Sequence, residues 1–331
     1  MANVQKYFDE FHKRIRTDYR SNSTLKEKRN IILKRIANHL AENDRPGFRR
    51  LLQGSYKMKT GVIPIEELEY DIDVGLRFGI TEHEYDAGTV RSWVYEAVDG
   101  HTESVEEHGP CIRVTYKDKP VYHVDLVTYA NWIDEDEKEQ FRLGHKTDGW
   151  LPSEPKDLIQ YVTDKREPFK NTKDTATQTD QFRRVVRYQR RWIDERIPEM
   201  TDAKPPGIAF TLLAAERLAP HVDWVGDPDD LSALASIALS ASTQSGRIVV
   251  KKPTQEYDDV FCRLSNEEMD DLKSGYKEMY EALMAAKAET APEKACAILQ
   301  KIFGRDFPVP KSEEVAKATA APAIVTSSRS G

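Results

Sequence analysis

The spacing of hydrophobic residues changes twice along the chain, and this change constrains the fold more than any other feature of the sequence. Between Gln53 and Tyr129 apolar residues recur at every second position, which is typical of β-strands with one buried face. Before and after this region they recur at three- and four-residue intervals, which is typical of amphipathic helices. A strand-forming region enclosed by helical regions predicts an α+β fold.

Three strands and several helices can be placed from this spacing. The expected strands are YDIDVGLRF (70–78), CIRVTY (111–116) and VYHVDLVTY (121–129), of which the last two form a hairpin across KDKP. The expected helices cover residues 4–15, 24–40, 181–197, 207–219, 227–242 and 265–288. Thr24 with Glu27, and Ser265 with Glu268, have the spacing of capping boxes, which predicts a helix start at each pair.

We expect the chain to have three parts. Residues 1–165 hold the N-terminal helices and the strand region, and residues 166–310 form a helical domain. Residues 311–331 are rich in small and polar side chains and are expected to form a flexible tail.

Composition and charge argue against several classes of protein. The chain is 39% hydrophobic, which is enough for packed cores, and its net charge is −7, whereas proteins that grip a nucleic-acid backbone are usually basic. The three cysteines are far apart and have neither zinc nor disulfide spacing. The sequence shows no signal peptide and no apolar run of membrane length, so we expect a cytoplasmic protein without a membrane partner.

Two aspartates lie one residue apart on the polar face of the first expected strand. Asp71 and Asp73 share this face because side chains alternate along a strand, and their like charges repel each other. Asp125, inside the otherwise apolar VYHVDLV, is a third carboxylate on a later strand. Mg²⁺ prefers carboxylate oxygens, so the three residues predict a two-metal site. The alternative interpretation is a solvated edge strand for the pair and a hydrogen-bonded turn at Asp125.

A Gly-Ser turn precedes the strand that carries the two aspartates. Gly54 allows the backbone to approach a phosphate closely, and the hydroxyl of Ser55 can bind that phosphate. The neighbouring Gln53 and Lys57 are expected to belong to the same nucleotide-binding site. A Gly-Ser dipeptide is common, and it is informative here because of the strand that follows it.

The order of Gly54-Ser55, the Asp-Ile-Asp strand and Asp125 resembles the nucleotidyltransferase superfamily typified by DNA polymerase beta. QGSYKMKT, YDIDVGL, VYHVDLV, DGWLPSEPKDL and FRRVVRYQRRW look like the branch that contains oligoadenylate synthase, cyclic GMP-AMP synthase and the bacterial cyclic-oligonucleotide synthases, or CD-NTases. The resemblance covers most of residues 1–310. It implies a bilobed fold, in which a polymerase-beta-like core with a mixed sheet is joined to a helical domain that closes the nucleotide pocket.

The resemblance also implies an activity. Asp71, Asp73 and Asp125 would be catalytic and would hold two Mg²⁺ ions, which Mn²⁺ could replace. The substrates would be nucleoside triphosphates, with purines expected, and the product a cyclic di- or trinucleotide second messenger of bacterial anti-phage (CBASS-type) signalling. No DNA activator is expected, because the zinc-bearing insertion and basic platform of the animal DNA sensor are not apparent here.

The helix expected at residues 181–197 carries a run of arginines. Such a run usually marks a solvated face, but arginine also suits bidentate binding of phosphate. By resemblance, Arg190 occupies the place of a lysine that contacts the donor triphosphate, and we expect Arg190 and Arg187 to bind phosphate. Gly207 stands where the family tends to have a serine, so a hydroxyl contact of the donor pocket is missing.

Other functions are compatible with the same residues. A linear-product or RNA-modifying transferase shares the three aspartates, and so does a protein-modifying transferase, whereas a non-catalytic nucleotide sensor would be expected to lack one of them. Some synthases of the resembled family are conjugated at their C-terminal residue by a ubiquitin-transfer-like enzyme. In this chain that residue would be Gly331, and an ordinary frayed terminus is the alternative.

Overall fold

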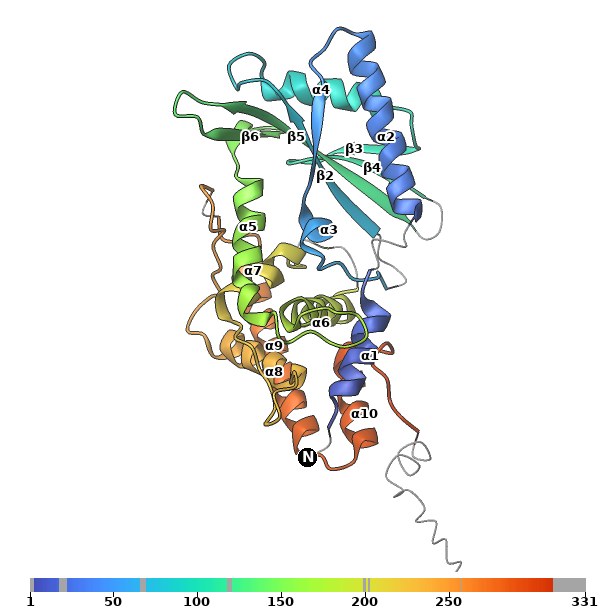
Figure 1. Cartoon of the computed structure of the whole chain (residues 1–331), viewed down its shortest axis with the longest axis vertical. Coiled ribbons are helices and arrows are strands. Elements are labelled where there is room, and N and C mark those ends of the chain that lie inside the picture. Colours follow the sequence, from blue (N-terminus) through green and yellow to red (C-terminus); the bar gives the residue numbers. More distant parts are fainter. Residues whose placement is uncertain are drawn as a thin grey trace, which may run out of the picture.

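The structure is a computed structural model of the 331-residue chain, and it describes residues 3–17, 23–65, 70–117, 121–198, 201, 203–256 and 258–311. Two lobes lie one above the other along the longest axis of the molecule (Figure 1). The upper one, the core lobe, holds a sheet and the helices that cover it, and the lower one, the helical lobe, consists of helices. This arrangement confirms the expected bilobed α+β fold.

The core lobe is built on a mixed seven-stranded sheet. Its strands are β1 (Phe48–Leu52), β2 (Tyr70–Phe78), β3 (Ser104–Glu107), β4 (Ile112–Tyr116), β5 (Tyr122–Ile133), β6 (Glu139–His145) and β7 (Gly149–Pro152). The sheet has the order β1-β2-β5-β4-β3, and β6 joins the second half of β5 and pairs with β7. β2 and β5 are parallel neighbours, and β4 and β5 form the expected antiparallel pair.

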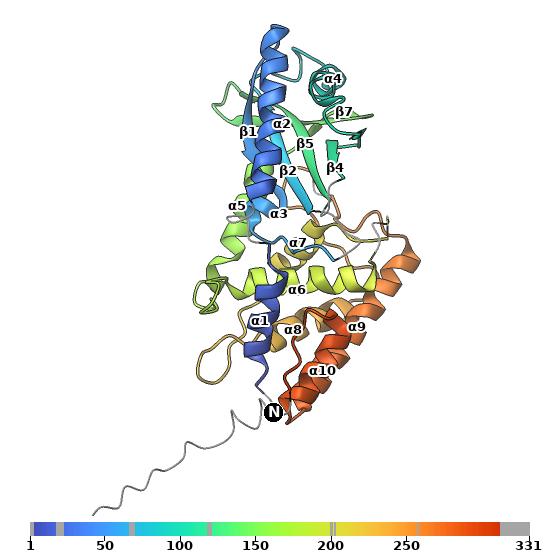
Figure 2. The ribbon, with the colours of Figure 1, turned by 90° about the vertical axis from the view of Figure 1, so that its right-hand side faces the viewer.

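Two helices cover one face of this sheet. α2 (Ser23–Glu42) and α4 (Ala87–Val98) lie along it (Figure 2), and their apolar residues form one hydrophobic core with those of the strands. The alternate residues of β2 that face these helices are fully buried, among them Ile72, Val74 and Leu76. The strand's polar residues, Asp71 and Asp73 included, therefore point to the opposite face.

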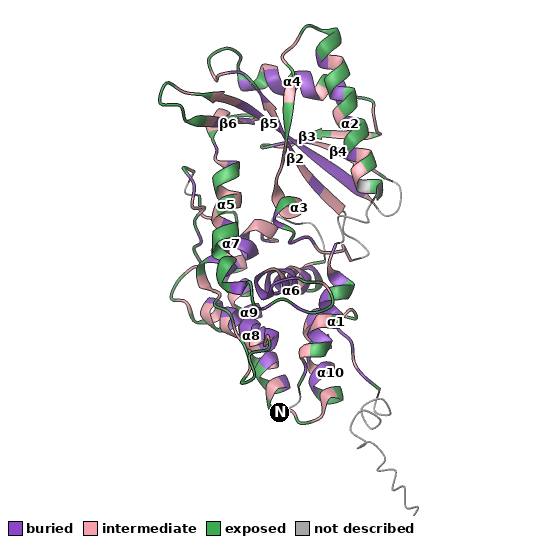
Figure 3. Ribbon diagram, in the orientation of Figure 1, coloured by how far each residue is buried: buried purple, intermediate pink, exposed green. Residues whose placement is uncertain are grey.

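A single buried helix runs through the middle of the helical lobe. It is α6 (Gln181–Arg196), and its ribbon is almost wholly coloured as buried in Figure 3. The helices of this lobe that lie around it are α1 (Gln5–Ile15), α7 (Gly207–Arg217), α8 (Asp230–Thr243), α9 (Asn266–Ala288) and α10 (Pro292–Phe303). Between the lobes lie α3 (Gly54–Met58) and α5 (Pro155–Lys165). A short 3-10 turn, η1 (Glu167–Phe169), follows α5 and packs Phe169 against Phe182 in the helical lobe.

The first helix departs from the expected division of the chain at residue 165. α1 packs in the helical lobe, where Phe8 and Phe11 are fully buried. Their rings lie 5.3 Å from that of Tyr188 on α6, and the Phe11 ring lies 5.3 Å from that of Phe303 on α10. The apolar side of α1 thus fits a groove made by helices that follow much later in the chain, which chain order alone does not reveal.

The structure describes both of the expected helix starts but only the first residue of the expected tail. Ser265 and Glu268 form both hydrogen bonds of a capping box before α9, as expected. α2 begins at Ser23, one residue before the expected cap at Thr24. The expected tail and Gly331 lie outside the described residues, apart from Lys311. Within the described ranges, no helix is both long and apolar enough to cross a membrane.

Candidate active site

Strand register brings the three aspartates together. In the parallel pair of β2 and β5, Asp73 lies directly opposite Asp125, and Asp71 lies opposite His123. Residues that are opposite each other in a parallel pair point to the same face of the sheet, and Asp71 and Asp73 already share that face. The three carboxylates therefore gather on the face that α2 and α4 leave uncovered.

The Gly-Ser turn lies against the second of these aspartates. Gly54 has φ +60°, and a Cβ atom at this position would come 1.8 Å from Oδ2 of Asp73, which is far inside van der Waals contact. Glycine is thus required twice, once for its backbone conformation and once for the space that the Asp73 carboxylate occupies. The turn opens α3, so the backbone of Gly54 and Ser55 is held beside the carboxylates.

The charge on Asp73 is poorly compensated in this structure. Burial raises the pKa of Asp73 well above its ordinary value, and the neighbouring carboxylates of Asp71 and Asp125 raise it further. Arg190 and Arg113 act in the opposite direction but do not cancel these effects. A carboxylate in this position favours a proton or a cation beside it.

Asp125 differs from Asp73 because it has a strong ionic partner. Arg113 on β4 lies opposite Asp125 in the sheet, and its Nε and Nη2 donate to the two carboxylate oxygens, each over 2.8 Å. Nδ1 of His123 lies 3.4 Å from Oδ1. Burial raises the pKa of Asp125, but Arg113 and His123 outweigh burial and hold that pKa below its ordinary value.

The residues present fit a divalent cation, although their arrangement is not that of a closed metal cage. Among the described residues, no group of three or more histidine, cysteine, aspartate or glutamate side chains is close enough to hold a metal ion. The donors are nevertheless hard carboxylate oxygens, which Mg²⁺ prefers. The uncompensated charge that raises the pKa of Asp73 is the condition that a bound cation would relieve.

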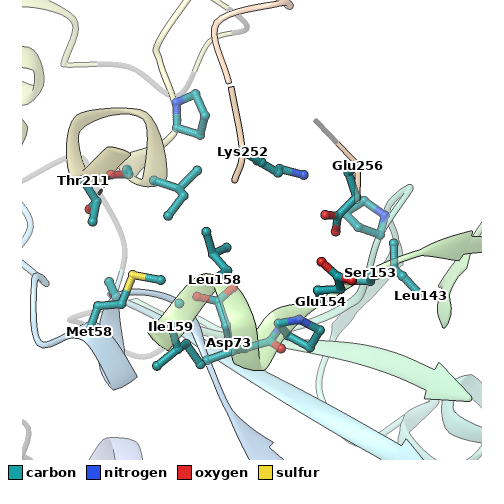
Figure 4. A pocket seen from close by; sticks show the side chains of 18 of the residues that line it. Met58, Asp73, Leu143, Ser153, Glu154, Leu158, Ile159, Thr211, Lys252 and Glu256 are labelled. Atoms are coloured by element: carbon teal, nitrogen blue, oxygen red, sulfur yellow. Dashed lines mark hydrogen bonds between the residues drawn. The ribbon is translucent and has the colours of Figure 1, made fainter. Parts of the chain in front are cut away.

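Two cavities meet at this site. Cavity 1 has a volume of about 690 Å³ and lies on the side of α5 and α7, and Asp73, Leu158 and Ile159 are among the lining residues labelled in Figure 4. Cavity 2 has about 700 Å³ and reaches Arg113 and His123. The residues that line both cavities are Ser55, Asp71, Arg190, Pro206 and Gly207. Each cavity is in the size range of small-molecule sites, and the shared wall carries a metal-type carboxylate and a guanidinium.

Arg190 is the α6 arginine that faces the cavities. Its Nη1 donates to the carbonyl of Thr60 over 3.0 Å, and its charge lowers the pKa of Asp73, against the raising effect of burial. A Cβ atom on Gly207 would lie 3.1 Å from Cζ of Arg190, so the absence of a side chain at position 207 leaves room for the guanidinium. A serine at position 207, where the resembled family tends to have one, would crowd the guanidinium of Arg190.

Three other expected nucleotide-binding residues have different positions. Gln53 lines cavity 1 and accepts a hydrogen bond from the hydroxyl of Tyr129. Lys57 is exposed on α3 and lines neither cavity. Arg187 is 4% exposed and donates to the carbonyls of Lys59 and Gly61, so it is turned into the protein, and we correct the expectation that it contacts phosphate.

The structure adds residues to the site that sequence reasoning missed. Arg113 could have been noticed as a charge on an otherwise apolar strand, one strand away from Asp125. Lys252 and Glu256 line cavity 1 from a strap (residues 251–256), and the Gln255 N–H of this strap donates to Glu154 before α5 over 3.0 Å. Figure 4 shows Glu256 near Ser153 and Glu154 at the wall of the cavity. No local sequence signal marks the strap.

Comparison with a family model identifies the region that holds the site. Residues 48–129 match the model described as cyclic GMP-AMP synthase DncV-like, nucleotidyltransferase domain. This range starts at β1 and ends within β5, so it contains the Gly-Ser turn and all three aspartates.

Similar proteins extend the comparison to the rest of the chain. A cyclic GMP-AMP synthase from Escherichia albertii is 23% identical over 319 residues. The match covers 90% of this chain but 64% of that relative, so this chain spans less than two thirds of the relative's length.

Solved structures show the same fold in both lobes. Vibrio cholerae DncV cyclic AMP-GMP synthase, in complex with the linear intermediate 5′ pppA(3′,5′)pG, has a TM-score of 0.74 and 17% identity, with 94% of this chain and 97% of that chain covered. CdnC from Escherichia coli MS115-1 with ATP has a TM-score of 0.65 and 16% identity, with 92% and 98% covered. These likenesses confirm the polymerase-beta-like nucleotidyltransferase fold.

Proposed function

Because the chain carries a nucleotidyltransferase domain of the DncV-like family in a DncV-like fold, we propose that it is a metal-dependent synthase of a cyclic di- or trinucleotide. The observation that supports this most directly is the pair of cavities that share Ser55, Asp71 and Arg190 as a common wall. Two nucleotides bound in the two cavities would meet at this wall. The substrates we propose are nucleoside triphosphates, in keeping with the nucleotide complexes of DncV and CdnC.

The carboxylates and the basic groups have distinct tasks in this proposal. Asp71, Asp73 and Asp125 would hold two Mg²⁺ ions, or Mn²⁺ in their place, and these ions would supply charge neutralisation at the reacting oxygens. Arg190 and the Gly54-Ser55 backbone would bind the phosphates of the donor nucleotide. Fixing both nucleotides in the cavities supplies much of the catalysis, because the reaction becomes effectively unimolecular.

The proposed reaction is a displacement at phosphorus. A ribose hydroxyl of the acceptor nucleotide releases its proton to solvent and attacks the α-phosphate of the donor, so one O–P bond forms while the bond to pyrophosphate breaks. The product is linear and still carries a triphosphate at its other end. A second displacement between the same nucleotides closes the ring and releases a second pyrophosphate.

The proposed biological role follows from the product class. A cyclic oligonucleotide is a diffusible signal, and we propose that this one serves bacterial anti-phage signalling of the CBASS type. The family resemblance supports this role, which is tested in cells. Bacteria that carry the chain with its neighbouring genes should lose phage resistance when Asp73→Asn is introduced, and unchanged resistance would contradict the role.

The activity is tested with the purified full-length chain. It is incubated with Mg²⁺ and all four labelled nucleoside triphosphates, and the products are treated with phosphatase and identified by mass spectrometry. We expect pyrophosphate release and a phosphatase-resistant cyclic product, and Asp73→Asn serves as the inactive control. A lasting linear product or label on a protein would favour the alternative transferases. If the chain forms no product with either Mg²⁺ or Mn²⁺ and binds no nucleotide, the proposal that it is a nucleotidyltransferase is wrong.

A further inference from the structure

Three arginines of α6 hold the backbone that follows the Gly-Ser turn. Arg187, Arg190 and Arg191 donate to carbonyl oxygens of residues 59–63, the segment directly after α3. The donor–acceptor distances are 2.5 Å (Arg187 Nη2 to Lys59), 3.0 Å (Arg190 Nη1 to Thr60), 3.0 Å (Arg187 Nε to Gly61) and 2.6 Å (Arg191 Nη2 to Ile63). Helix α6 of the helical lobe thus binds the backbone of residues 59–63, which lie between the two lobes.

Two of these arginines are almost completely buried. Arg187 is 4% exposed and Arg191 is 1% exposed. Removing a guanidinium from water is unfavourable unless its donors are paired, and within the described residues Nε and Nη1 of Arg191 have no hydrogen-bond partner. An apolar side chain of similar length would fill the same space at lower cost. Arginine adds hydrogen bonds to the backbone at both positions, and each residue also has one side-chain partner: Nη2 of Arg191 lies 3.3 Å from Oδ2 of Asp306, and Nη1 of Arg187 lies 2.8 Å from Nε2 of His12.

The gripped segment is connected to the Gly-Ser turn through the backbone. The N–H groups of Lys59 and Thr60 both donate to the carbonyl of Ser55, the latter over 3.0 Å. Lys59 ends α3 in the left-handed conformation with φ +57°, which a residue with a side chain adopts only when its surroundings hold it there. Arg187 holds the carbonyl of this same residue, so its position is transmitted to Ser55 and to Gly54, which touches Asp73.

We propose that Arg187 and Arg191 are positioning residues that fix the Gly-Ser turn relative to the three aspartates. Their hydrogen bonds to residues 59–63 are called the clamp below. Because both arginines belong to the helical lobe, the clamp also sets the distance between the lobes at the wall shared by the two cavities. Neither residue is proposed to touch substrate, unlike Arg190. The kinetic part of this inference rests on the proposed nucleotidyl transfer, whereas the structural part does not.

The structural part is tested by hydrogen exchange on the full chain without nucleotide. In Arg187→Met, amides of residues 54–63 should exchange at least about tenfold faster than in the unmodified chain, while those of α4 keep their rates. Arg196→Met is the matched control, because this arginine lies on the same helix but pairs with Asp271 and Glu278 on α9. Unchanged exchange at residues 54–63 in Arg187→Met, or equal acceleration in the control, would overturn the clamp.

The kinetic part is tested on Arg187→Met and Arg191→Met, with each rate divided by the folded fraction of the variant. Displacing a binding turn by about 1 Å can cost on the order of a hundredfold in rate, so kcat of Arg187→Met and Arg191→Met should fall roughly 10- to 100-fold. KM should change less than kcat, and Arg187→Lys should recover part of the loss because it restores one donor. A fall in kcat that disappears after this division would show a purely structural role and would overturn the kinetic part. If the unmodified chain forms no product, the proposed function fails while the exchange experiment still decides the clamp.

Discussion

Asp73 is the residue at which the charges of the site conflict most directly. It has two carboxylate neighbours and touches a turn that only glycine can form. Asp125, one strand away, avoids this conflict because Arg113 occupies both of its oxygens. The two residues thus have opposite pKa shifts although they lie side by side, and Asp73 is the one that a cation would affect most.

Asp73→Asn should raise stability and abolish activity. The folded-state pKa of Asp73 lies above the unfolded value, so ionised Asp73 costs stability at neutral pH, and the amide removes this cost. A gain of about 1 kcal/mol corresponds to roughly 1–2 °C in a chain of this size, because the entropy of unfolding grows with chain length. Activity should fall by about a thousandfold or more.

Differential scanning fluorimetry with and without Mn²⁺ checks this prediction. The cation should stabilise the unmodified chain and have little effect on Asp73→Asn. A variant that melts earlier than the unmodified chain, or that keeps the full response to Mn²⁺, would contradict the assignment.

Gly54→Ala should disturb the site more than the fold. The added Cβ would strike the Asp73 carboxylate, and the misplacement should lower kcat by about a hundredfold. Gly100→Ala is the control, because Gly100 also has a positive φ but nothing within 4 Å of the added atom. Both variants should lose about 1 kcal/mol from the backbone conformation, measured by urea unfolding, and the control should keep its activity. Equal kcat values for the two variants would refute the contact argument.

At the scale of elements, α6 joins parts of the molecule through its arginines. Besides the segment after α3, Arg187 contacts α1, where its Nη1 lies 2.8 Å from Nε2 of His12. An arginine can only donate, so Nε2 accepts, and the neutral ring carries its proton on Nδ1. Burial lowers the pKa of His12, and the charges of Arg187 and Arg184 lower it further. α1 therefore docks on α6 with an uncharged histidine.

His12→Gln should weaken the dependence of stability on acid. Because the folded pKa of His12 lies below the unfolded value near 6.5, the unfolded chain binds the extra proton, and stability falls as the pH drops below about 6.5. For one proton the slope reaches about 1.4 kcal/mol per pH unit. Urea unfolding between pH 5 and 8 should show a smaller slope in the variant by up to this amount. Parallel curves would show that His12 binds its proton over the same pH range in the folded and unfolded chains, and would contradict the lowered pKa.

Local elements were more predictable from the sequence than their partners. The β2 strand and its two aspartates follow from alternation within one segment, and so does the start of α9 at Ser265. The ion pair of Arg113 with Asp125 depends on the register of two strands, and the strap over cavity 1 comes from a segment over a hundred residues later than its contact, Glu154. From the sequence, the arginines of α6 look like an exposed basic face. Several of them bind backbone carbonyls more than a hundred residues earlier in the chain, which no nearby residue indicates.

For the whole molecule, charge distribution separates this chain from nucleic-acid binders. The net charge is −7, and arginines of α6 such as Arg187 and Arg191 donate to backbone carbonyls inside the protein. A long polyanion would gain little from releasing counterions on such a surface. The expected partners are small nucleotides held in cavities, as in the proposed function.

Duplex DNA should therefore leave the rate of synthesis unchanged within about twofold at physiological salt. The initial rate of pyrophosphate release with and without a long duplex measures this directly, and heparin serves as a second polyanion. A large increase with DNA alone would show that the chain senses DNA, and the expectation of DNA-independent activity would be wrong.

The position of α1 has a consequence for how the chain could be rearranged. The helical lobe takes its first helix from the beginning of the chain, and the ring of Phe307 lies 5.2 Å from that of Phe8. The two ends of the described chain are thus neighbours in one hydrophobic core. A circular permutation that links the end of the described chain to its first helix would make this lobe continuous in sequence, whereas simple truncation at residue 165 would leave an open hydrophobic groove.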